Sequence, residues 1–189
     1  LGDVYKRQDV IEEALQDNEN TEKSSKVLVA YYSATGNTKA AAETIADAAG
    51  GELFELQPAE AYTTEDLDYN DPESRVCKEH EDPDLQDVKL EEVTPESFPN
   101  ADVVFLGYPI WWGEAAWPVN EFVKENDFTG KTVIPFCTSA SSSLGDSGEN
   151  LAEMAGTGEW QEGKRFSSGA AEEEIRNLSL IHISEPTRR

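Results

Sequence analysis

The 189-residue chain has few basic side chains: 15 Lys and Arg stand against 39 Asp and Glu, which gives a formal net charge of -24. Nucleic acids and anionic membrane surfaces would repel so acidic a protein. We therefore expect neither of them as a partner. A protein with a basic surface, or a small neutral ligand, fits this charge.

Cysteine and long apolar runs are also scarce. The only cysteines are Cys77 and Cys137, which form no C-x-x-C pair, so we expect neither a disulfide framework nor a thiolate metal site. The longest nearly apolar run, residues 103–112, is shorter than the roughly 20 residues that a membrane-spanning helix needs. We expect a cytoplasmic protein, although the chain begins at Leu1 and not at Met, so a targeting segment ahead of it stays open.

Both ends of the chain differ from its middle. Residues 1–8 and 178–189 resemble translated sequencing-adapter sequence, and residues 9–25 are polar and acidic with little apolar content. We interpret residues 1–25 as an adapter-like and linker segment that we expect to be disordered. Residues 178–189 are interpreted as an adapter-like tail. This leaves residues 26–177 as one domain.

Between these ends, β-prone apolar runs alternate with helical patterns. Residues 26–32 form an almost continuous apolar run, the pattern of a parallel strand buried on both faces. The predicted strands are 26–32, 52–56, 102–107, 132–137 and 163–167, and the predicted helices are 38–49, 119–125, 149–155 and 170–177. This alternation predicts an α/β fold of right-handed βαβ units around a parallel sheet, with the first strand in a central position.

One segment, residues 60–97, departs from this alternation. It contains 14 acidic and three basic residues, three prolines and scattered aromatic residues. Like charges at this density gain little for a folded core, and long loops without structure of their own are often functional. We interpret this acidic excursion as a long surface loop, either a docking surface for a basic protein or a solvated loop that keeps the protein soluble.

The loop after the first strand has the composition of a phosphate site. Ser33-Ala34-Thr35-Gly36-Asn37-Thr38 leads directly into a helix, so hydroxyls, a glycine and backbone N–H groups meet at a helix N-terminus. This combination favours a phosphate nest, and a plain Ser/Thr-rich helix cap stays open as the alternative. The loop matches neither G-x-x-x-x-G-K-S/T nor G-x-G-x-x-G, which disfavours a Walker site and a dinucleotide fingerprint.

Two further loops follow the next buried strands. The segment 108–115 holds the adjacent Trp111 and Trp112, which are costly to expose unless a flat ring such as isoalloxazine covers them. As the alternative, either Trp packs on the sheet edge or under the acidic excursion. The segment 138–145 is rich in serine and offers hydrogen-bond donors to a polar heteroaromatic edge. Because ligands bind at the carboxyl ends of parallel strands, the three loops predict one site.

At these three loops the sequence resembles the flavodoxin family. Residues 33–38 follow the family's phosphate pattern of hydroxyl, any residue, Thr, Gly, any residue, Thr. The segments Tyr-Pro-Ile-Trp-Trp-Gly and Phe-Cys-Thr-Ser resemble the flavin-ring loops of a bacterial branch of that family. The resemblance covers residues 26–177. It implies a flavodoxin-like three-layer sandwich, with a five-stranded parallel sheet in the order 2-1-3-4-5, that binds one FMN.

The resemblance also implies which residues hold the cofactor. Those expected at the phosphate are Ser33, Ala34, Thr35, Gly36, Asn37 and Thr38. Those expected around the ring are Pro109, Ile110, Trp111, Trp112, Gly113, Thr138, Ser139, Ala140 and Ser141. The acidic excursion departs from the minimal fold of the family, so the resemblance does not define the partner.

From these features we expect a flavodoxin-like carrier that shuttles electrons through FMN to a redox partner protein with a basic surface. The flavin supplies the chemistry, so no side chain is expected as a catalytic acid or base and none as a metal ligand. Two alternatives stay open. One is an NAD(P)H-dependent quinone or flavin reductase, with Tyr62, Tyr69 or Trp117 lining a pocket over the ring; the other is a non-redox module that binds flavin. The oligomeric state also stays open.

Overall fold

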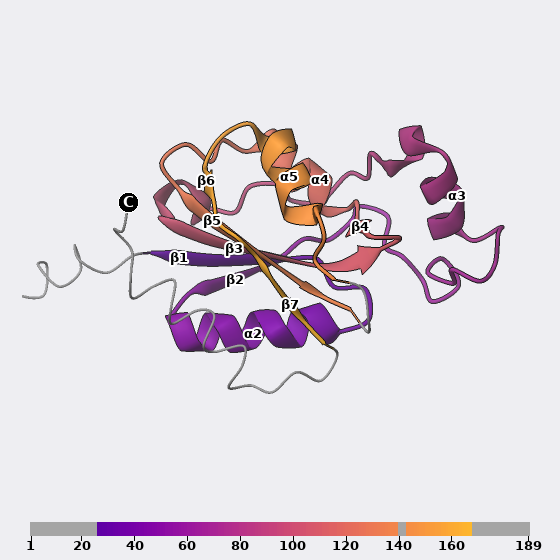
Figure 1. Ribbon diagram of the computed structural model, residues 1–189, viewed down its shortest axis with the longest axis horizontal. Coiled ribbons are helices and arrows are strands. Elements are labelled where there is room, and N and C mark those ends of the chain that lie inside the picture. Colours follow the sequence, from indigo (N-terminus) through magenta and orange to yellow (C-terminus); the bar gives the residue numbers. More distant parts are fainter. Residues whose placement is uncertain (1–25, 140–142, 168–189) are drawn as a thin grey trace, which may run out of the picture.

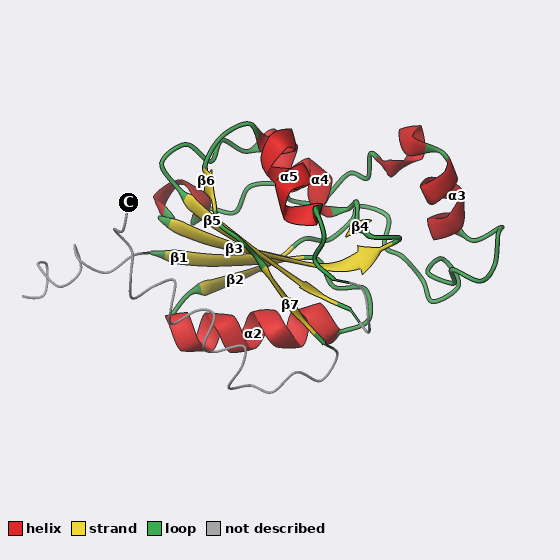
Figure 2. Ribbon diagram, viewed as in Figure 1, coloured by secondary structure: helices red, strands yellow, loops and turns green. Residues whose placement is uncertain are grey.

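A computed structural model of the protein describes residues 26–139 and 143–167 (Figure 1). The expected linker, both adapter-like ends and the predicted helix 170–177 lie outside the described residues, as do Ala140 and Ser141 of the expected ring site. The described part is an α/β sandwich in which one twisted sheet lies between helices (Figure 2).

The sheet confirms the predicted order. The strands are β1 (Val27–Tyr31), β2 (Glu52–Glu55), β3 (Val103–Trp111), β4 (Glu114–Ala115), β5 (Thr132–Thr138), β6 (Glu159–Trp160) and β7 (Lys164–Phe166). Neighbouring strands follow the order β2-β1-β3-β5-β6, with β7 also paired to β5. All of these pairs are parallel, and only β4, which pairs with β3, is antiparallel among the described strands. With β6 and β7 sharing the fifth position, this is the expected 2-1-3-4-5 arrangement.

The fifth position is divided because β5 contains a proline. The first two residues of β5 pair with β6 and its last three pair with β7, so Ile134 and Pro135 lie opposite the break. Pro135 has no N–H group to donate to a neighbouring strand. Residues 161–163 span the same stretch as these two residues of β5 and therefore form a bulge. The predicted edge strand 163–167 is confirmed as β7, and its separation from β6 was not predicted.

Helices cover both faces of the sheet. They are α2 (Asn37–Ala49), α3 (Arg75–Glu81), α4 (Val119–Glu125) and α5 (Ser147–Ala155), with short 3-10 helices η1 (Pro83–Gln86) and η2 (Phe98–Asn100). In Figure 1, α2 lies below the sheet, α4 and α5 lie above it, and α3 lies beyond its edge near β4. Three of these helices match predicted ranges closely, because each has an apolar face and ends at Gly or at a polar residue.

Side chains of β1 alternate between two cores, as expected for a strand buried on both faces. Val29 packs with Ile45 and its neighbours on the α2 side. Leu28 packs with Phe122 of α4 on the other side. All five residues of β1 are buried, so the carboxyl end of this strand is held rigidly in the centre of the sheet.

The third strand is longer than predicted. The sequence predicted a strand over 102–107 and a loop from Tyr108, but β3 continues to Trp111. Tyr108 and Pro109 remain paired with β5, while Ile110 and Trp111 pair with β4 as a hairpin. The loop interpretation of Pro109, Ile110 and Trp111 is therefore wrong, because an antiparallel partner immediately downstream supplies the hydrogen bonds that extend the strand.

The acidic excursion is also more ordered than predicted. It contains α3 and η1, and α3 begins with Ser74, whose hydroxyl accepts a hydrogen bond from the N–H of Cys77. Val76, Cys77 and Val88 form a small core with Trp117. The interpretation as a surface loop without structure is wrong, because these apolar side chains, scattered among the acids in the sequence, pack together into a core.

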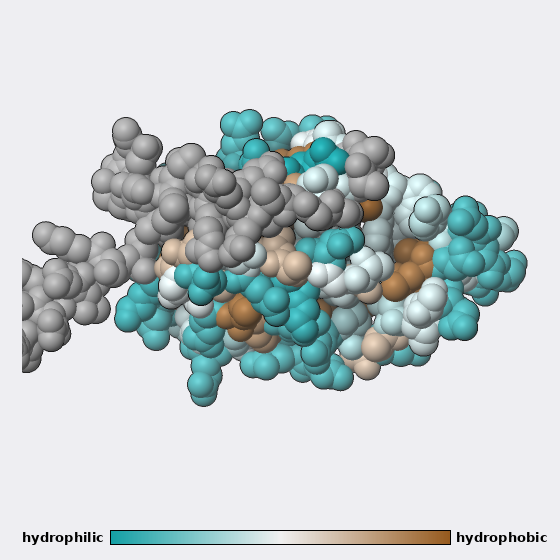
Figure 3. Space-filling model, turned by 90° about the horizontal axis from the view of Figure 1, so that it is seen from below, coloured by the Kyte–Doolittle hydropathy of each residue, from teal (hydrophilic) through white to brown (hydrophobic). Residues whose placement is uncertain are grey.

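No helix within residues 26–139 and 143–167 is long and apolar enough to cross a bilayer. In the same ranges, no group of three or more His, Cys, Asp and Glu side chains is arranged to hold a metal ion. Seen from the α2 side, the described surface is mostly hydrophilic, and its apolar areas are small (Figure 3). This surface agrees with the acidic composition.

Candidate functional site

Three segments that follow neighbouring strands lie at one edge of the sheet. β1 pairs in parallel with β3, and β3 pairs in parallel with β5, so their carboxyl ends share this edge. The segments are the phosphate loop (residues 33–38), the tryptophan hairpin (residues 109–115) and the start of the serine loop (Thr138 and Ser139). The structure thus brings together the described parts of all three predicted loops.

In the phosphate loop, backbone N–H groups converge on one oxygen. Gly36 N–H donates to Ser33 Oγ at 3.0 Å and Lys39 N–H donates to the same oxygen at 3.2 Å. Gly36 has a φ of 100°, which only glycine adopts readily, and this turns the chain into α2. Thr35, Gly36 and Asn37 are exposed, whereas Ser33 and Ala34 are half-buried. The loop therefore presents amide and hydroxyl groups at its surface.

The phosphate loop is tied directly to the serine loop. Thr38 in the first turn of α2 and Thr138 at the end of β5 are both buried, and their Oγ1 atoms lie 2.7 Å apart in a hydrogen bond. Asn37 Nδ2 donates to Thr35 Oγ1 at 3.4 Å within the loop. The relative position of the two predicted binding segments is thus fixed by a buried contact between side chains 100 residues apart.

The tryptophan hairpin turns through two residues with positive φ. Trp112 has a φ of 50° and Gly113 a φ of 80°, and the flanking Trp111 and Glu114 are paired. Two central residues with positive φ are typical of the tight turn that suits a twisted hairpin. Trp112 is the only described residue other than glycine with this backbone, and such strain in a bulky residue is often found at functional sites.

The two adjacent tryptophans have different surroundings. Trp111 is half-buried and packs edge-on against Trp117, with 4.9 Å between ring centroids, and also contacts Tyr32 and Tyr62. Trp112 is 43% exposed, and the imidazole of His80 stacks on it with centroids 4.1 Å apart and planes at 13°. The alternative prediction that a tryptophan packs under the acidic excursion therefore holds for Trp111 and holds in part for Trp112. Trp112 keeps exposed surface on which a ligand can stack.

Arg165 of β7 supports the serine loop and was not predicted. Its Nε donates to Ser139 Oγ at 3.0 Å, and its Nη2 donates to the Ser139 carbonyl at 3.1 Å. Burial raises the pKa of the neighbouring Cys137 thiol to about 12, although the charge of Arg165 lowers it. Cys137 is therefore a neutral thiol at ordinary pH. One feature of the sequence could have pointed to Arg165: it is one of few basic residues in the chain, and it lies on a predicted edge strand whose end adjoins the serine loop.

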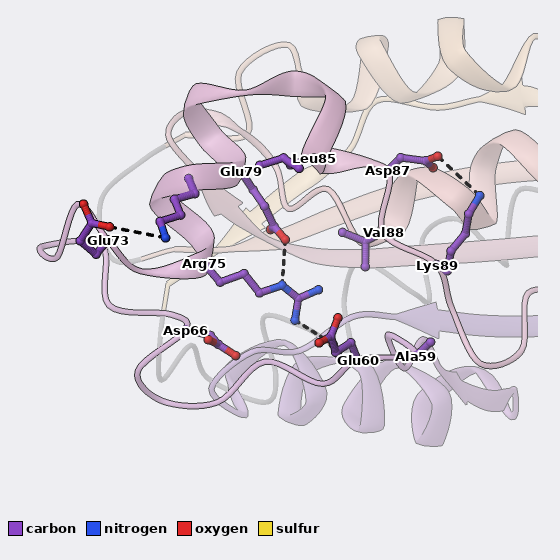
Figure 4. Close-up of a pocket in the computed structure, with 11 residues that line it drawn as sticks. Ala59, Glu60, Asp66, Glu73, Arg75, Glu79, Leu85, Asp87, Val88 and Lys89 are labelled. Carbon is purple, nitrogen blue, oxygen red and sulfur yellow. Dashed lines mark hydrogen bonds and ion pairs between the residues drawn. The ribbon is translucent and has the colours of Figure 1, made fainter.

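A buried carboxylate connects the acidic excursion to the tryptophan hairpin. Glu79 is only 6% exposed. Its Oε1 accepts hydrogen bonds from Tyr62 at 2.6 Å and from Trp117 Nε1 at 2.7 Å, and its Oε2 accepts one from Arg75 Nε at 2.8 Å. Figure 4 shows Arg75 and Glu79 pointing toward one another. Only the spacing of four residues between Arg75 and Glu79 was visible in the sequence.

The donors of this cluster stay protonated. Burial, and then the hydrogen bond to Glu79, raises the pKa of Tyr62 well above its usual value. Burial alone would lower the pKa of Arg75, but the hydrogen bond to Glu79 raises it overall. Of the residues named for a reductase pocket, Trp117 is buried and Tyr69 is 71% exposed.

A cavity of about 730 Å³ lies in the acidic excursion beside this cluster. Charged side chains of both signs line it, including Glu60, Asp66, Arg75 and Lys89 (Figure 4). Within the described residues, none of the aromatic side chains expected over a flavin ring is among its lining. The cavity is therefore separate from the edge where the three loops meet.

Comparison with known proteins agrees with this architecture. A family model described as Flavodoxin matches residues 26–179. A candidate flavoprotein from Bacteroides eggerthii has a solved structure that is 41% identical, with a TM-score of 0.76, and the match covers 85% of this chain and 99% of that one. A second, from Bacteroides uniformis, is 38% identical, with a TM-score of 0.74 and coverage of 82% and 97%.

A more distant structure shares the fold. The flavoprotein from Lactobacillus acidophilus, solved in complex with FMN, is 20% identical, with a TM-score of 0.55 and coverage of 85% and 99%. A comparison with curated proteins gave no match. The family model spans most of the chain, including all three loops at the sheet edge, and the chain belongs to the flavodoxin family.

Proposed function

We propose that the protein binds FMN at the edge where the three loops meet. The observation that carries this proposal is the phosphate loop, where the backbone N–H groups of Gly36 and Lys39 gather around Ser33 Oγ at the N-terminus of α2 and the exposed Thr35 lies beside them. Neutral donors of this kind at a helix N-terminus suit a phosphate monoester. The family match and the FMN complex of the Lactobacillus acidophilus protein support the same cofactor.

The residues of the other two segments fit the ring of FMN. Trp111 and Trp112 offer aromatic surface, and Thr138 and Ser139 offer polar groups next to it. The flavin-ring site consists of these four residues together with Pro109, Ile110 and Gly113. The Thr38–Thr138 hydrogen bond holds this site and the phosphate loop in register, so one rigid edge can hold both ends of the cofactor.

Bound FMN would supply one- and two-electron exchange, and the protein would act as an electron carrier. The chain's own part is to bind the cofactor, orient it and set its potential. With a net charge of -24, the protein disfavours added negative charge at the site, so the acidic field would lower the potential of a step that adds an electron. No side chain is assigned to proton transfer.

The partner that fits this carrier is a redox protein with a basic surface. Many acids of the acidic excursion are exposed, including Glu81 and Asp84, and opposite charges accelerate the encounter of two proteins. Glu79 does not belong to this surface, because it is buried and fully engaged in hydrogen bonds within the protein. The docking surface is therefore the exposed acids around α3.

The test of the carrier function is electron transfer from the photoreduced, FMN-loaded protein to cytochrome c, which is basic, with NADH or NADPH oxidation measured in parallel. We expect transfer to cytochrome c and no steady turnover of either nicotinamide. Steady NAD(P)H oxidation would support the reductase instead. Binding of FMN without reversible reduction would support the non-redox module.

The docking surface has its own test and a matched control. The pair Glu81→Gln and Asp84→Asn should slow transfer to cytochrome c at low salt, and the difference should fade near physiological ionic strength, where the Debye length is about 8 Å. The control pair Glu43→Gln and Glu153→Gln removes the same charge from exposed positions on α2 and α5. Equal slowing by both pairs would show an effect of net charge and not of docking at α3.

A further inference from the structure

The position of α3 relative to the tryptophan hairpin is fixed by Glu79. Its carboxylate accepts hydrogen bonds from Tyr62 and Arg75 of the acidic excursion and from Trp117, which follows β4. Gln86 Nε2 also donates to the Glu79 carbonyl at 2.9 Å. A buried charge with a cationic partner and several donors is costly to disrupt, so these contacts hold the helix in one place.

The same cluster reaches the ends of the central strands. The guanidinium carbon of Arg75 lies 3.7 Å from the centroid of the Tyr62 ring. Tyr62 contacts Tyr32 after β1, with 6.3 Å between centroids, and Trp111 of β3, with 5.6 Å. Aromatic contacts of this geometry add to the packing of the rings. The acidic excursion is thus continuous with the flavin-ring site and not a separate appendage.

His80 is the next residue after Glu79, and it faces the hairpin. Its imidazole stacks on Trp112 with planes at 13° and centroids 4.1 Å apart. His80 itself is exposed, so its ring is not needed to fill a core. The stack covers one face of Trp112, which is the tryptophan of this hairpin with the larger exposed area, 43%.

We propose that His80 is a specificity-determining residue of the flavin-ring site, and that α3, held by Glu79, is a fixed wall of that site. The imidazole occupies one face of Trp112, where a planar aromatic electron acceptor would otherwise stack. Small anions that accept electrons without stacking are not affected by it. This inference rests on the proposed function, and its consequence is that the site would favour a protein partner over quinones.

The test compares two acceptors in the FMN-loaded protein, reduced anaerobically with light. 2-Methyl-1,4-naphthoquinone takes two electrons and two protons from the reduced cofactor and leaves as the hydroquinone. Ferricyanide takes one electron per molecule, so two molecules are reduced to ferrocyanide for each cofactor reoxidised. Both rates are measured by stopped-flow absorbance for the wild type, His80→Ala and His80→Phe.

His80→Ala uncovers Trp112, and we expect the naphthoquinone rate constant to rise roughly two- to tenfold, the range given by one aromatic stacking contact. His80→Phe keeps a flat ring at this position and should retain the wild-type rate. Ferricyanide should react equally with all three proteins. An unchanged naphthoquinone rate in His80→Ala, or an equal rise in His80→Phe, would overturn the role of His80.

A second variant tests the anchor. Glu79→Gln removes the charge that Arg75 pairs with while keeping the size of the side chain, and it should raise the naphthoquinone rate as His80→Ala does. A wild-type rate in folded Glu79→Gln would overturn the part assigned to Glu79. Failure of the wild type to bind FMN would refute the proposed function, whereas normal binding with unchanged rates would refute only this inference.

Discussion

The hydrogen bond between Thr38 and Thr138 gives the sharpest test of how the site is assembled. The two side chains are 1% and 5% exposed, and their hydroxyls meet at 2.7 Å. Thr138→Val keeps the shape of the side chain but leaves the buried Thr38 hydroxyl without this partner. Such a loss costs about 1–3 kcal/mol of unfolding free energy. Thr38→Val should cost a similar amount.

The double variant separates the hydrogen bond from the two side chains. With both hydroxyls removed, no buried group is left unpaired by the change, and the loss should be at least about 1 kcal/mol smaller than the sum of the two single losses. Thr132→Val, at the half-buried start of β5, is a matched control that should change stability by less than about 0.5 kcal/mol.

Urea unfolding of the apoprotein, followed by tryptophan fluorescence, measures all four variants against the wild type. Losses of unfolding free energy that add within error in the double variant would show that the two hydroxyls do not interact. The same result would remove the structural link proposed between the phosphate loop and the flavin-ring site.

Three further outcomes follow from the structure. Trp111→Ala should destabilise the apoprotein by roughly 3 kcal/mol and Trp112→Ala by much less, because only Trp111 packs among three aromatic rings; thermal unfolding measures this. Burial raises the pKa of Tyr31 to about 12 from 10.0. The neutral Tyr31 side chain therefore contributes its full share of the unfolding free energy below pH 10, and this contribution is lost as the pH rises toward 12. Tyr31→Phe should flatten that loss when the unfolding free energy is measured by urea titration across this pH range. Both cysteines are buried, and the raised pKa of Cys137 keeps its thiol neutral, so Ellman's reagent should react with neither until the protein unfolds; fast reaction of the native protein would contradict this.

The parallel sheet could be predicted because its evidence is local. Each buried strand is a short apolar run, and each helix ends near a glycine or a polar residue. The division of the fifth strand could not be predicted in the same way. Pro135 was visible, but its effect depends on which strand lies beside it, and that pairing joins residues far apart in the sequence.

The hairpin and the acidic excursion were misjudged for related reasons. Pro109 and Gly113 look like strand breakers, yet β4 lies close enough in sequence to extend β3 past the proline. Residues 60–97 include α3, whose buried face carries few residues. The acids therefore dominate the composition of the whole segment, and the helix is hidden in it. Glu79 looked like one more surface acid, and only the fold shows that Trp117, 38 residues away, donates to it.

The candidate site was predicted in its location more than in its contacts. The loop residues Ser33 to Thr38 and the adjacent tryptophans have strong local patterns, so their position at the sheet edge followed from the strand order. Arg165 and His80 were missed, because neither belongs to a local pattern. Both act through side-chain contacts across the fold, with Ser139 and Trp112 respectively.

FMN binding through the phosphate loop is tested directly by a calorimetric titration of the apoprotein with FMN and with riboflavin, repeated for Thr35→Ala. Thr35 is exposed in the phosphate loop, and losing one hydrogen bond to a charged group costs about 1.5–3 kcal/mol. We expect FMN to bind at least tenfold more tightly than riboflavin, and Thr35→Ala to weaken FMN binding by about tenfold or more while riboflavin binding is unchanged. Equal affinity of the wild type for both ligands would contradict binding through the phosphate loop.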